Sequence, residues 1–346
     1  MHRREFLKGG MALSAGFAVP GTIGLLAWSP RAEAADLSID LSARRGDVTM
    51  IDGTTALMFG FSATGAMSWP GPTLVCQEGD SITVNLDNTL HTPVAFKVGA
   101  TNIRYQASAQ NQISFTFSAP PAGTYLYYDD QNNGVNRIMG LHGTLVVMPA
   151  GIKDRPFVGG PQFVRQYKWM FSNVDPAWGE QVRNLGDYQV SAIDPDSFNP
   201  RYFTINGQAY ENTHEYNTEL MGHYDEAAYV RMLNAGGIVH APHFHGNHVE
   251  MVTINYERFS APFKNKDAVS MFPLDVRDVI FPFKAPPDAY PPVSTNQIQH
   301  FPMHCHVEMS QTAGGGSYPH GAHAPIVMGA APQTESDLTR KVDELS

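Results

Sequence analysis

The chain of 346 residues carries 33 acidic side chains against 23 lysines and arginines, a formal net charge of -10 with histidine neutral. An acidic chain with scattered charges argues against nucleic acid as a partner. The length is ample for two hydrophobic cores.

The first 35 residues resemble an export signal of the twin-arginine type. Residues 3–8 (RREFLK) hold the arginine pair, an apolar stretch follows over residues 9–28, and residues 32–34 (AEA) supply a small-residue cleavage site. No other stretch approaches the roughly 20 apolar residues that a membrane helix needs. We therefore expect a periplasmic or secreted protein with no membrane span after signal removal, and a tethered, uncleaved form is the alternative.

Most of the remaining chain reads as β-strands. Segments with β-branched or alternating residues lie at 80–86 (DSITVNL), 112–117 (QISFTF), 144–148 (TLVVM) and 249–254 (VEMVTI), and Gly, Pro and Asn separate them. An early strand of a second domain is expected around residues 165–171. The many glycines and prolines suit sandwiches with short turns. We expect an all-β chain with a first domain over residues 36–150, a second over 151–335 and a polar tail over 336–346.

Two motifs in the second domain concentrate metal-ligand side chains. They are residues 240–246 (HAPHFHG) and 304–306 (HCH), and nine of the 14 histidines lie between residues 240 and 323. The candidate metal ligands are His240, His243, His245, His304, Cys305 and His306. Imidazole with thiolate is the ligand set of copper and zinc, whereas oxygen-rich sets suit magnesium or calcium.

The spacing of the ligands predicts two separate sites. Alternate residues of a strand face the same side, so His243 can converge with His245, and His304 with His306. Cys305 then faces the opposite side. Pro242 disfavours helix just before it, which leaves His240 in extended or turning chain that can reach this other side. The alternative is that these histidines only pack or form hydrogen bonds in a core.

The two motifs resemble those of the multicopper oxidases, whose last cupredoxin domain ends with an HxxHxHG loop and an HCHxxxH strand. The scaffold is similar too. Residues 71–80 (GPTLVCQEGD), 123–125 (GTY) and 140–147 (GLHGTLVV) look like the family's first domain, and residues 201–210 (RYFTINGQAY) and 227–236 (AAYVRMLNAG) like its last. The resemblance covers most of the chain after about residue 40 and implies two cupredoxin-like Greek-key β-sandwich domains.

The resemblance also implies a role for each ligand. His240 and Cys305 match ligands of the type 1 copper, His243 matches a ligand of the type 2 copper, and His245, His304 and His306 match ligands of the type 3 pair. In the family, the type 1 copper takes electrons from a substrate and the trinuclear cluster reduces dioxygen to water.

The sequence departs from the family pattern in half of the ligands. The first domain reads AFKVG at residues 95–99 and YYDD at residues 127–130, where the family has four histidines. Ser310 stands where a histidine is expected after His306, and Gly315 falls at the position of the axial methionine. A trinuclear cluster is therefore not expected. About half of the family's ligands remain at the type 1 site and half at the trinuclear site.

Other residues are candidates to complete these sites. Asp130 offers a carboxylate, although a surface turn is the preferred reading. His320 and His323 follow a glycine-rich stretch that could fold them back towards Cys305, with a solvated loop as the alternative. His142 lies near the expected domain interface and is more often structural.

The sulfur-containing residues leave two further alternatives. Met303 and Met309 flank the HCH motif, and thioethers suit Cu(I), but core packing is the favoured reading for both. A disulfide between Cys76 and Cys305 is arithmetically available in an exported chain. We expect a free thiolate instead, because the HCH context has a use for one.

These observations predict an exported copper-binding oxidoreductase with an incomplete, non-trinuclear copper site in its second domain. Its partners would be a small-molecule or metal-ion reductant and dioxygen, and two-domain members of the family suggest a homotrimer. The alternatives are a copper-binding or electron-transfer protein without oxidase activity and a copper-free structural protein on the same fold.

Overall fold

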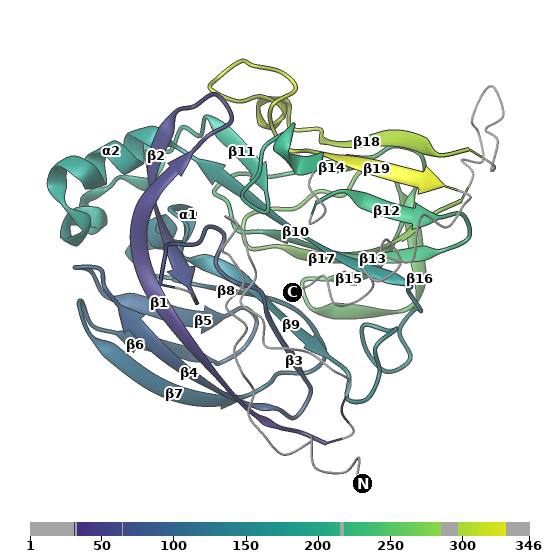
Figure 1. Ribbon diagram of the computed structural model, residues 1–346, viewed down its shortest axis with the longest axis horizontal. Helices are drawn as coiled ribbons and strands as arrows, with labels where there is room; N and C mark the ends of the chain where they lie inside the picture. The colour runs from purple at the N-terminus through teal and green to yellow at the C-terminus, as the bar shows by residue number, and fades with distance from the viewer. Residues whose placement is uncertain (1–30, 32, 64, 215–217, 285–296, 330–346) are drawn as a thin grey trace, which may run out of the picture.

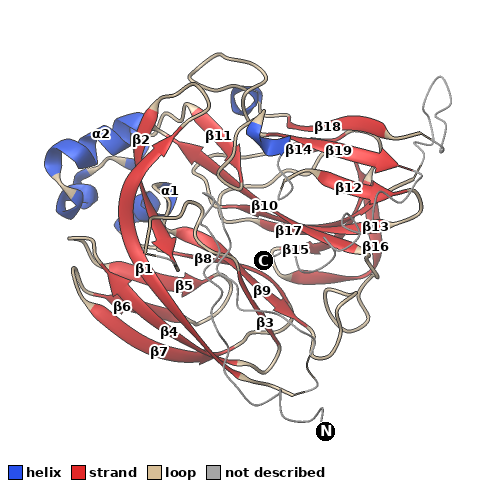
Figure 2. Cartoon of the chain, viewed as in Figure 1, coloured by secondary structure: helices blue, strands red, loops and turns tan. Residues whose placement is uncertain are grey.

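The computed structural model describes residues 31, 33–63, 65–214, 218–284 and 297–329. Nearly all of the expected export signal, the whole polar tail and the proline-rich segment 286–292 lie outside these residues. The described chain is dominated by strands that form two sandwiches side by side (Figures 1 and 2). The all-β prediction is confirmed.

The first sandwich is built from two sheets that enclose one apolar core. One sheet has the order β2 (Thr55–Ser62), β1 (Asp36–Thr49), β4 (Ser81–Asn88), β7 (Gln112–Ser118). The other has the order β3 (Leu74–Gln77), β9 (His142–Met148), β8 (Gly123–Tyr128), β5 (Val94–Val98), β6 (Arg104–Ala107). Strand β4 shows why the sheets pack: its alternate residues Ile82, Val84 and Leu86 are buried in this core.

The second sandwich carries both metal-ligand motifs. Its larger sheet has the order β11 (Tyr202–Ile205), β10 (Arg165–Val174), β13 (Ala227–Asn234), β17 (Val276–Pro282), β15 (Val249–Ile254), β16 (Glu257–Lys266). Its smaller sheet has the order β12 (Leu220–His223), β19 (His323–Gly329), β18 (Gln299–Cys305), β14 (Pro242–Phe244). Each of the five strands expected from sequence is present. Among the described strands no pairing joins the two sandwiches, and the domain boundary that we propose near Gly151 lies in their connection.

Helical segments occupy the connections, and sequence reasoning did not anticipate them. They are η1 (Asn132–Gly134), α1 (Val135–Ile138), α2 (Pro176–Leu185), η2 (Asp187–Ala192), η3 (Pro195–Ser197), η4 (Asn212–His214) and η5 (Glu308–Gln311). The start of α2 has a local cause, because the Asp175 side chain accepts a hydrogen bond from the Ala177 N–H and Pro176 follows it. Trp178 and Val182 of α2 pack into the first core. None of the described helices has the length and apolarity to cross a membrane.

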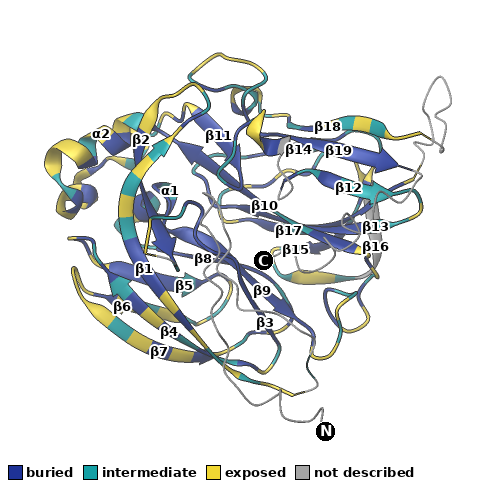
Figure 3. Cartoon of the chain, in the orientation of Figure 1, coloured by how far each residue is buried: buried dark blue, intermediate teal, exposed yellow. Residues whose placement is uncertain are grey.

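A buried interface joins the two sandwiches, as the dark blue central strands of Figure 3 illustrate. Val146 and Met148 of β9 share an apolar cluster with Tyr229 of β13 and Ile280 of β17. Arg231 of β13 is fully buried, and its Nη1 atom donates to Thr124 Oγ1 of β8 at 2.7 Å. The polar network at Arg231 therefore ties the metal-ligand domain to the first domain.

Candidate metal centre

Four histidines gather on one face of the smaller sheet of the second domain. Strand β14 pairs with β18 so that His243 lies opposite His304, and cross-strand partners share a face. The ring of His243 lies 4.4 Å from that of His245 and 4.2 Å from that of His306, centroid to centroid. The rings of His304 and His306 are 5.0 Å apart. The prediction that both His-x-His pairs share one face is confirmed.

A glycine turn allows the chain to leave the site. Gly246 has φ +83°, and a Cβ atom there would lie 2.7 Å from the ring of Phe301. A larger residue would be strained in the backbone and would also press on β18. The glycine that ends the HAPHFHG motif is therefore needed for the chain to turn directly after His245 and enter β15.

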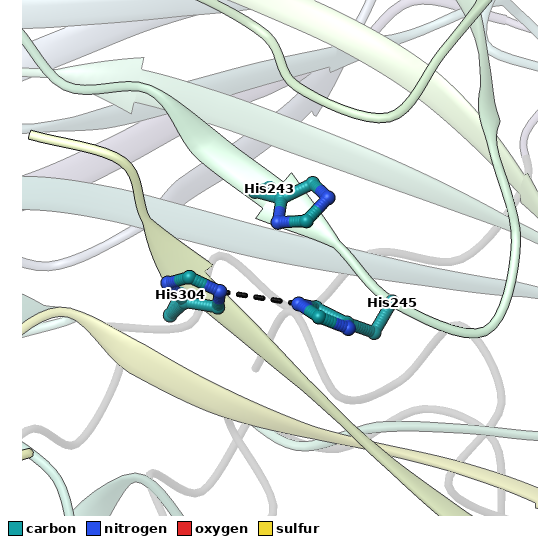
Figure 4. A group of neighbouring side chains, drawn as sticks. All are labelled: His243, His245 and His304. Carbon is teal, nitrogen blue, oxygen red and sulfur yellow. Dashed lines mark hydrogen bonds between the residues drawn. The ribbon is translucent and has the colours of Figure 1, made fainter.

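The nitrogens of three histidines lie close enough together to form a candidate metal site. The Nε2 atoms of His245 and His304 lie 3.1 Å apart, and one nitrogen of each of His243, His245 and His304 lies within 4.8 Å of the others (Figure 4). Two nitrogens bound at about 2.0–2.1 Å to one metal are about 2.9 Å apart at a right angle and about 3.3 Å apart at the tetrahedral angle. The 3.1 Å separation of the His245 and His304 Nε2 atoms falls between these values. The Nδ1 atom of His243 is buried and has no hydrogen-bond partner among the described residues.

The surroundings keep these imidazoles neutral. Burial, reinforced by the neighbouring histidines, lowers the pKa of His243 to about 4. Burial also lowers the pKa of His245, and the neighbouring His306 adds to this effect. Burial likewise lowers the pKa of His304, with contributions from His245 and His306. A neutral imidazole offers the lone pair that a metal binds, and a protonated one does not. The cluster is therefore ready to bind a metal at neutral pH.

Cys305 lies on the opposite face, as its place in the HCH motif predicts. Its thiol is fully buried, accepts the Ala241 N–H with an N–S distance of 3.1 Å and lies 3.6 Å from His240 Nδ1. The other ring nitrogen of His240, Nε2, lies 2.8 Å from Asn173 Nδ2. Sequence reasoning missed Asn173, although an asparagine within the apolar strand β10 is a signal of a buried polar contact. Ser310 lies at the position of the missing histidine, and its hydroxyl donates to the Val307 carbonyl oxygen at 2.7 Å.

The first-domain positions that lack histidine hold an ion-pair cluster instead. Asp130 contacts Lys97 Nζ at 3.3 Å and Arg104 Nη2 at 2.9 Å. Burial would raise the pKa of Asp130, but the hydrogen bonds from Arg104 and Lys97 outweigh it and lower that pKa. The carboxylate is thus already bound to two cations, which supports the surface-turn reading over metal ligation.

The side chains of the remaining histidine candidates contact groups other than the Cys305 thiol. His142 is buried, and its Nδ1 donates to the Arg137 carbonyl oxygen at 2.8 Å while its Nε2 accepts from Ser172 Oγ at 3.0 Å. Both contacts support the structural reading. His323 pairs with His304 across β18 and β19 and therefore faces the histidine cluster rather than the thiol. His320 Nδ1 lies 3.1 Å from the Tyr210 carbonyl oxygen.

The sulfur residues give a mixed outcome. Cys76 and Cys305 are both free, and each is buried in a different core, so the disulfide alternative is wrong. Met303 lies in the second core, as expected. Met309 is 44% exposed, so the core reading is wrong for it. It follows the end of β18 and lies in η5, where strand alternation no longer applies.

Comparisons with known proteins agree with this architecture. Residues 46–151 match the family model for multicopper oxidases. No curated protein matches the sequence. The blue copper oxidase from Nitrosomonas europaea is 21% identical with a TM-score of 0.67, and the match covers 85% of this chain and 86% of that chain. The multicopper oxidase mgLAC is 22% identical with a TM-score of 0.68, over 87% of this chain and 88% of that chain.

A copper nitrite reductase from Nitrosomonas europaea has the same fold at 15% identity, with a TM-score of 0.62 over 89% of this chain and 98% of that chain. The resemblance read from the sequence is thus confirmed: residues 46–151 match the multicopper oxidase family model, and the described chain shares the cupredoxin-like fold of these solved structures.

Proposed function

We propose that the protein is an exported copper-dependent oxidoreductase whose metal centre is the histidine cluster of the second domain, without a trinuclear cluster. The observation that carries this proposal is the 3.1 Å separation of the His245 and His304 Nε2 atoms with His243 beside them. Imidazole suits copper and zinc alike. The match of residues 46–151 to the multicopper oxidase family model favours copper.

The residues of the cluster would have distinct roles. His243, His245 and His304 would hold the metal, and three protein ligands leave a further position open to water or substrate. His306 is exposed and lies against the ring of His243, on the solvent side of the cluster. Copper, when bound, supplies one-electron redox chemistry. A half-exposed site of this kind would suit a small-molecule or metal-ion reductant, with dioxygen as the oxidant.

A copper-binding or electron-transfer protein without oxidase activity is the second candidate. The ion pairs of Asp130 with Lys97 and Arg104 favour it, because the first domain offers cations and one carboxylate where the family has histidines. A copper-free structural protein on the same fold is the third candidate. A homotrimer remains part of the proposal.

Metal analysis of the exported protein tests the proposal. We expect copper in the wild type, and we expect His243→Ala and His304→Ala each to lose it. His248→Ala is the matched control, since His248 is exposed and lies outside the three-histidine group. A wild-type protein that remains metal-free after reconstitution with copper would overturn the proposal and favour the structural candidate.

Oxygen uptake separates the two copper-binding candidates. Copper-loaded wild type is supplied in turn with phenols, Cu(I) and Fe(II), and dissolved dioxygen is followed with an electrode. Consumption that disappears in His304→Ala would support the oxidoreductase. Tight copper binding without consumption for any reductant would instead support electron transfer or copper binding alone.

A further inference from the structure

The side-chain amide of Asn173 has a fixed orientation. Its Oδ1 atom lies 2.9 Å from the backbone nitrogen of Gly237 and 3.2 Å from that of Ile238. Backbone N–H groups can only donate, so the atom that faces them must be the carbonyl oxygen. The neighbouring Gly236 makes room for this arrangement, because a Cβ atom there would overlap Asn173 Oδ1. The NH2 group of Asn173 therefore points the other way, towards His240.

This orientation determines where His240 carries its proton. Asn173 Nδ2 lies 2.8 Å from His240 Nε2, and an amide NH2 group only donates, so Nε2 must accept. A neutral imidazole has one donor and one acceptor nitrogen, which places the proton on Nδ1. The Nδ1 atom is the one that faces Cys305, with an N–S distance of 3.6 Å. The N–H bond of His240 thus points at the sulfur, and the lone pair points away from it.

A metal between His240 and Cys305 would require the opposite tautomer. The Nδ1 lone pair would have to face the sulfur, and the Nε2 proton would then meet the amide hydrogens of Asn173. His240 and Asn173 are both fully buried, so water cannot relieve that contact. The sulfur already accepts the Ala241 N–H, and the Ser310 hydroxyl donates to the Val307 carbonyl. Cys305 and His240 therefore fit a hydrogen-bonded pair better than they fit metal ligands.

We propose that Asn173 keeps metal out of the His240–Cys305 site by fixing His240 in its Nδ1-protonated form. The family resemblance assigns that pair to a type 1 copper, and the hydrogen bonds of Asn173 oppose the assignment. The pair instead links the chain before β14 to the end of β18, directly behind the histidine cluster. This inference stands whether or not the cluster binds copper.

Substitution of Asn173 by aspartate tests the proposal as a gain of metal binding. In Asn173→Asp, one carboxylate oxygen can keep the Gly237 and Ile238 N–H groups while the other accepts from His240 Nε2. The proton then moves to Nε2, and the Nδ1 lone pair faces Cys305. We expect Cu(II) to give no thiolate-to-copper absorption band with the wild type, a clear band with Asn173→Asp and about one more copper per chain in the variant. The band must vanish in Asn173→Asp with Cys305→Ser.

Two outcomes would overturn the proposal. One is a strong band in the wild type that Cys305→Ser removes. The other is a folded Asn173→Asp protein that takes up no additional copper. The copper titrations of the wild type and of Asn173→Asp are repeated with His243→Ala and His304→Ala added to each. Copper bound at the Cys305 site is then measured without copper bound at the histidine cluster.

A measurement on the metal-free wild type keeps the proposal testable if Asn173→Asp fails to fold. Long-range 1H–15N correlation spectra of the histidine side chains identify which ring nitrogen carries the proton, and His240→Gln assigns the signal. We expect His240 to be protonated at Nδ1. Protonation at Nε2 would overturn the proposal without reference to any metal.

Discussion

The Nε2 atoms of His245 and His304 approach within 3.1 Å although the residues are 59 positions apart in the sequence. Two neutral imidazoles can meet at this distance only by sharing a proton or a metal. Since a nitrogen of His243 lies within 4.8 Å of a nitrogen of each of these residues, the group has the composition of a three-histidine metal site.

Single substitutions of the clustered histidines should show which of them bind copper and which only lie beside the site. We expect His245→Ala to weaken Cu(II) binding more than about 100-fold, because loss of even a hydrogen-bond partner of a ligand costs roughly 10–100-fold. His306→Ala should weaken it less than about 10-fold, since His306 lies outside the three-histidine group. Competition with a chelator of known affinity measures both. Equal losses would contradict a three-ligand centre.

The carboxylate of Asp130 should be irrelevant to metal content. Asp130→Asn removes the ion pairs with Lys97 and Arg104, which are partly exposed, so the stability change should stay within about 1 kcal/mol. Copper per chain, measured by elemental analysis, should equal that of the wild type. A loss of copper in Asp130→Asn alone would show that the first domain contributes a ligand.

Acid should destabilise the metal-free protein through His142. Burial lowers the pKa of His142 to about 4, whereas a histidine in an unfolded chain titrates near about 6.5. Below about pH 6.5 the unfolded state binds more protons at this residue than the folded state does. The stability that the neutral, buried His142 contributes is therefore fully present above about pH 6.5 and is lost as the pH falls towards about 4. At pH 5 the loss from this one residue is roughly 2 kcal/mol.

Denaturant unfolding at pH 7 and pH 5 measures this loss. His142→Gln keeps a donor for the Arg137 carbonyl and an acceptor for Ser172 but does not titrate, so the difference between the two pH values should shrink. His248→Gln, at an exposed position, is the control and should leave the difference unchanged. An unchanged difference in His142→Gln would contradict the prediction.

The buried Arg231 and Asp278, which are neighbours across β13 and β17, should depend on each other for stability. Thr124 Oγ1 accepts from Arg231 Nη1 and donates to Asp278 Oδ1 at 2.8 Å, which joins two buried charged residues. Arg231→Leu leaves Asp278 buried without a nearby cation, and we expect a loss of roughly 3–5 kcal/mol in the free energy of unfolding. Arg231→Leu with Asp278→Asn should lose less than the sum of the two single changes. Strict additivity in calorimetry or denaturant unfolding would argue against the coupling.

Both cysteines should be present as thiols but protected. Burial, with Asp80 adding to it, raises the pKa of the Cys76 thiol well above its usual range, and Cys305 is fully buried. A thiol reagent should label neither cysteine in the native protein over minutes, and both after unfolding without reductant. Absence of labelling in the unfolded protein would reveal a disulfide and contradict the free thiols seen here.

The local pattern of the sequence was enough to predict which side chains share a face. His243 with His245, His304 with His306 and Cys305 on the other side all follow from the two-residue period of a strand, and the structure confirms them. The same period placed Met303 in the core and failed at Met309, because the strand has ended there. Helix α2 was missed although Asp175 and Pro176 signal its start and the buried Trp178 and Val182 recur at helical spacing, so its signals were present in the sequence.

The sequence by itself therefore determined the all-β architecture, the resemblance to multicopper oxidases and the two faces of the ligand motifs, because these depend on residues close together in the chain. The tertiary structure alone decided what each ligand contacts. Asn173 and His240 are 67 positions apart, and their hydrogen bond places a proton where a metal would need a lone pair. Asp130 is likewise bound by Arg104 from another strand. Such contacts depend on how distant strands pack, and no local pattern specifies the direction of a single amide or the partner of a single carboxylate.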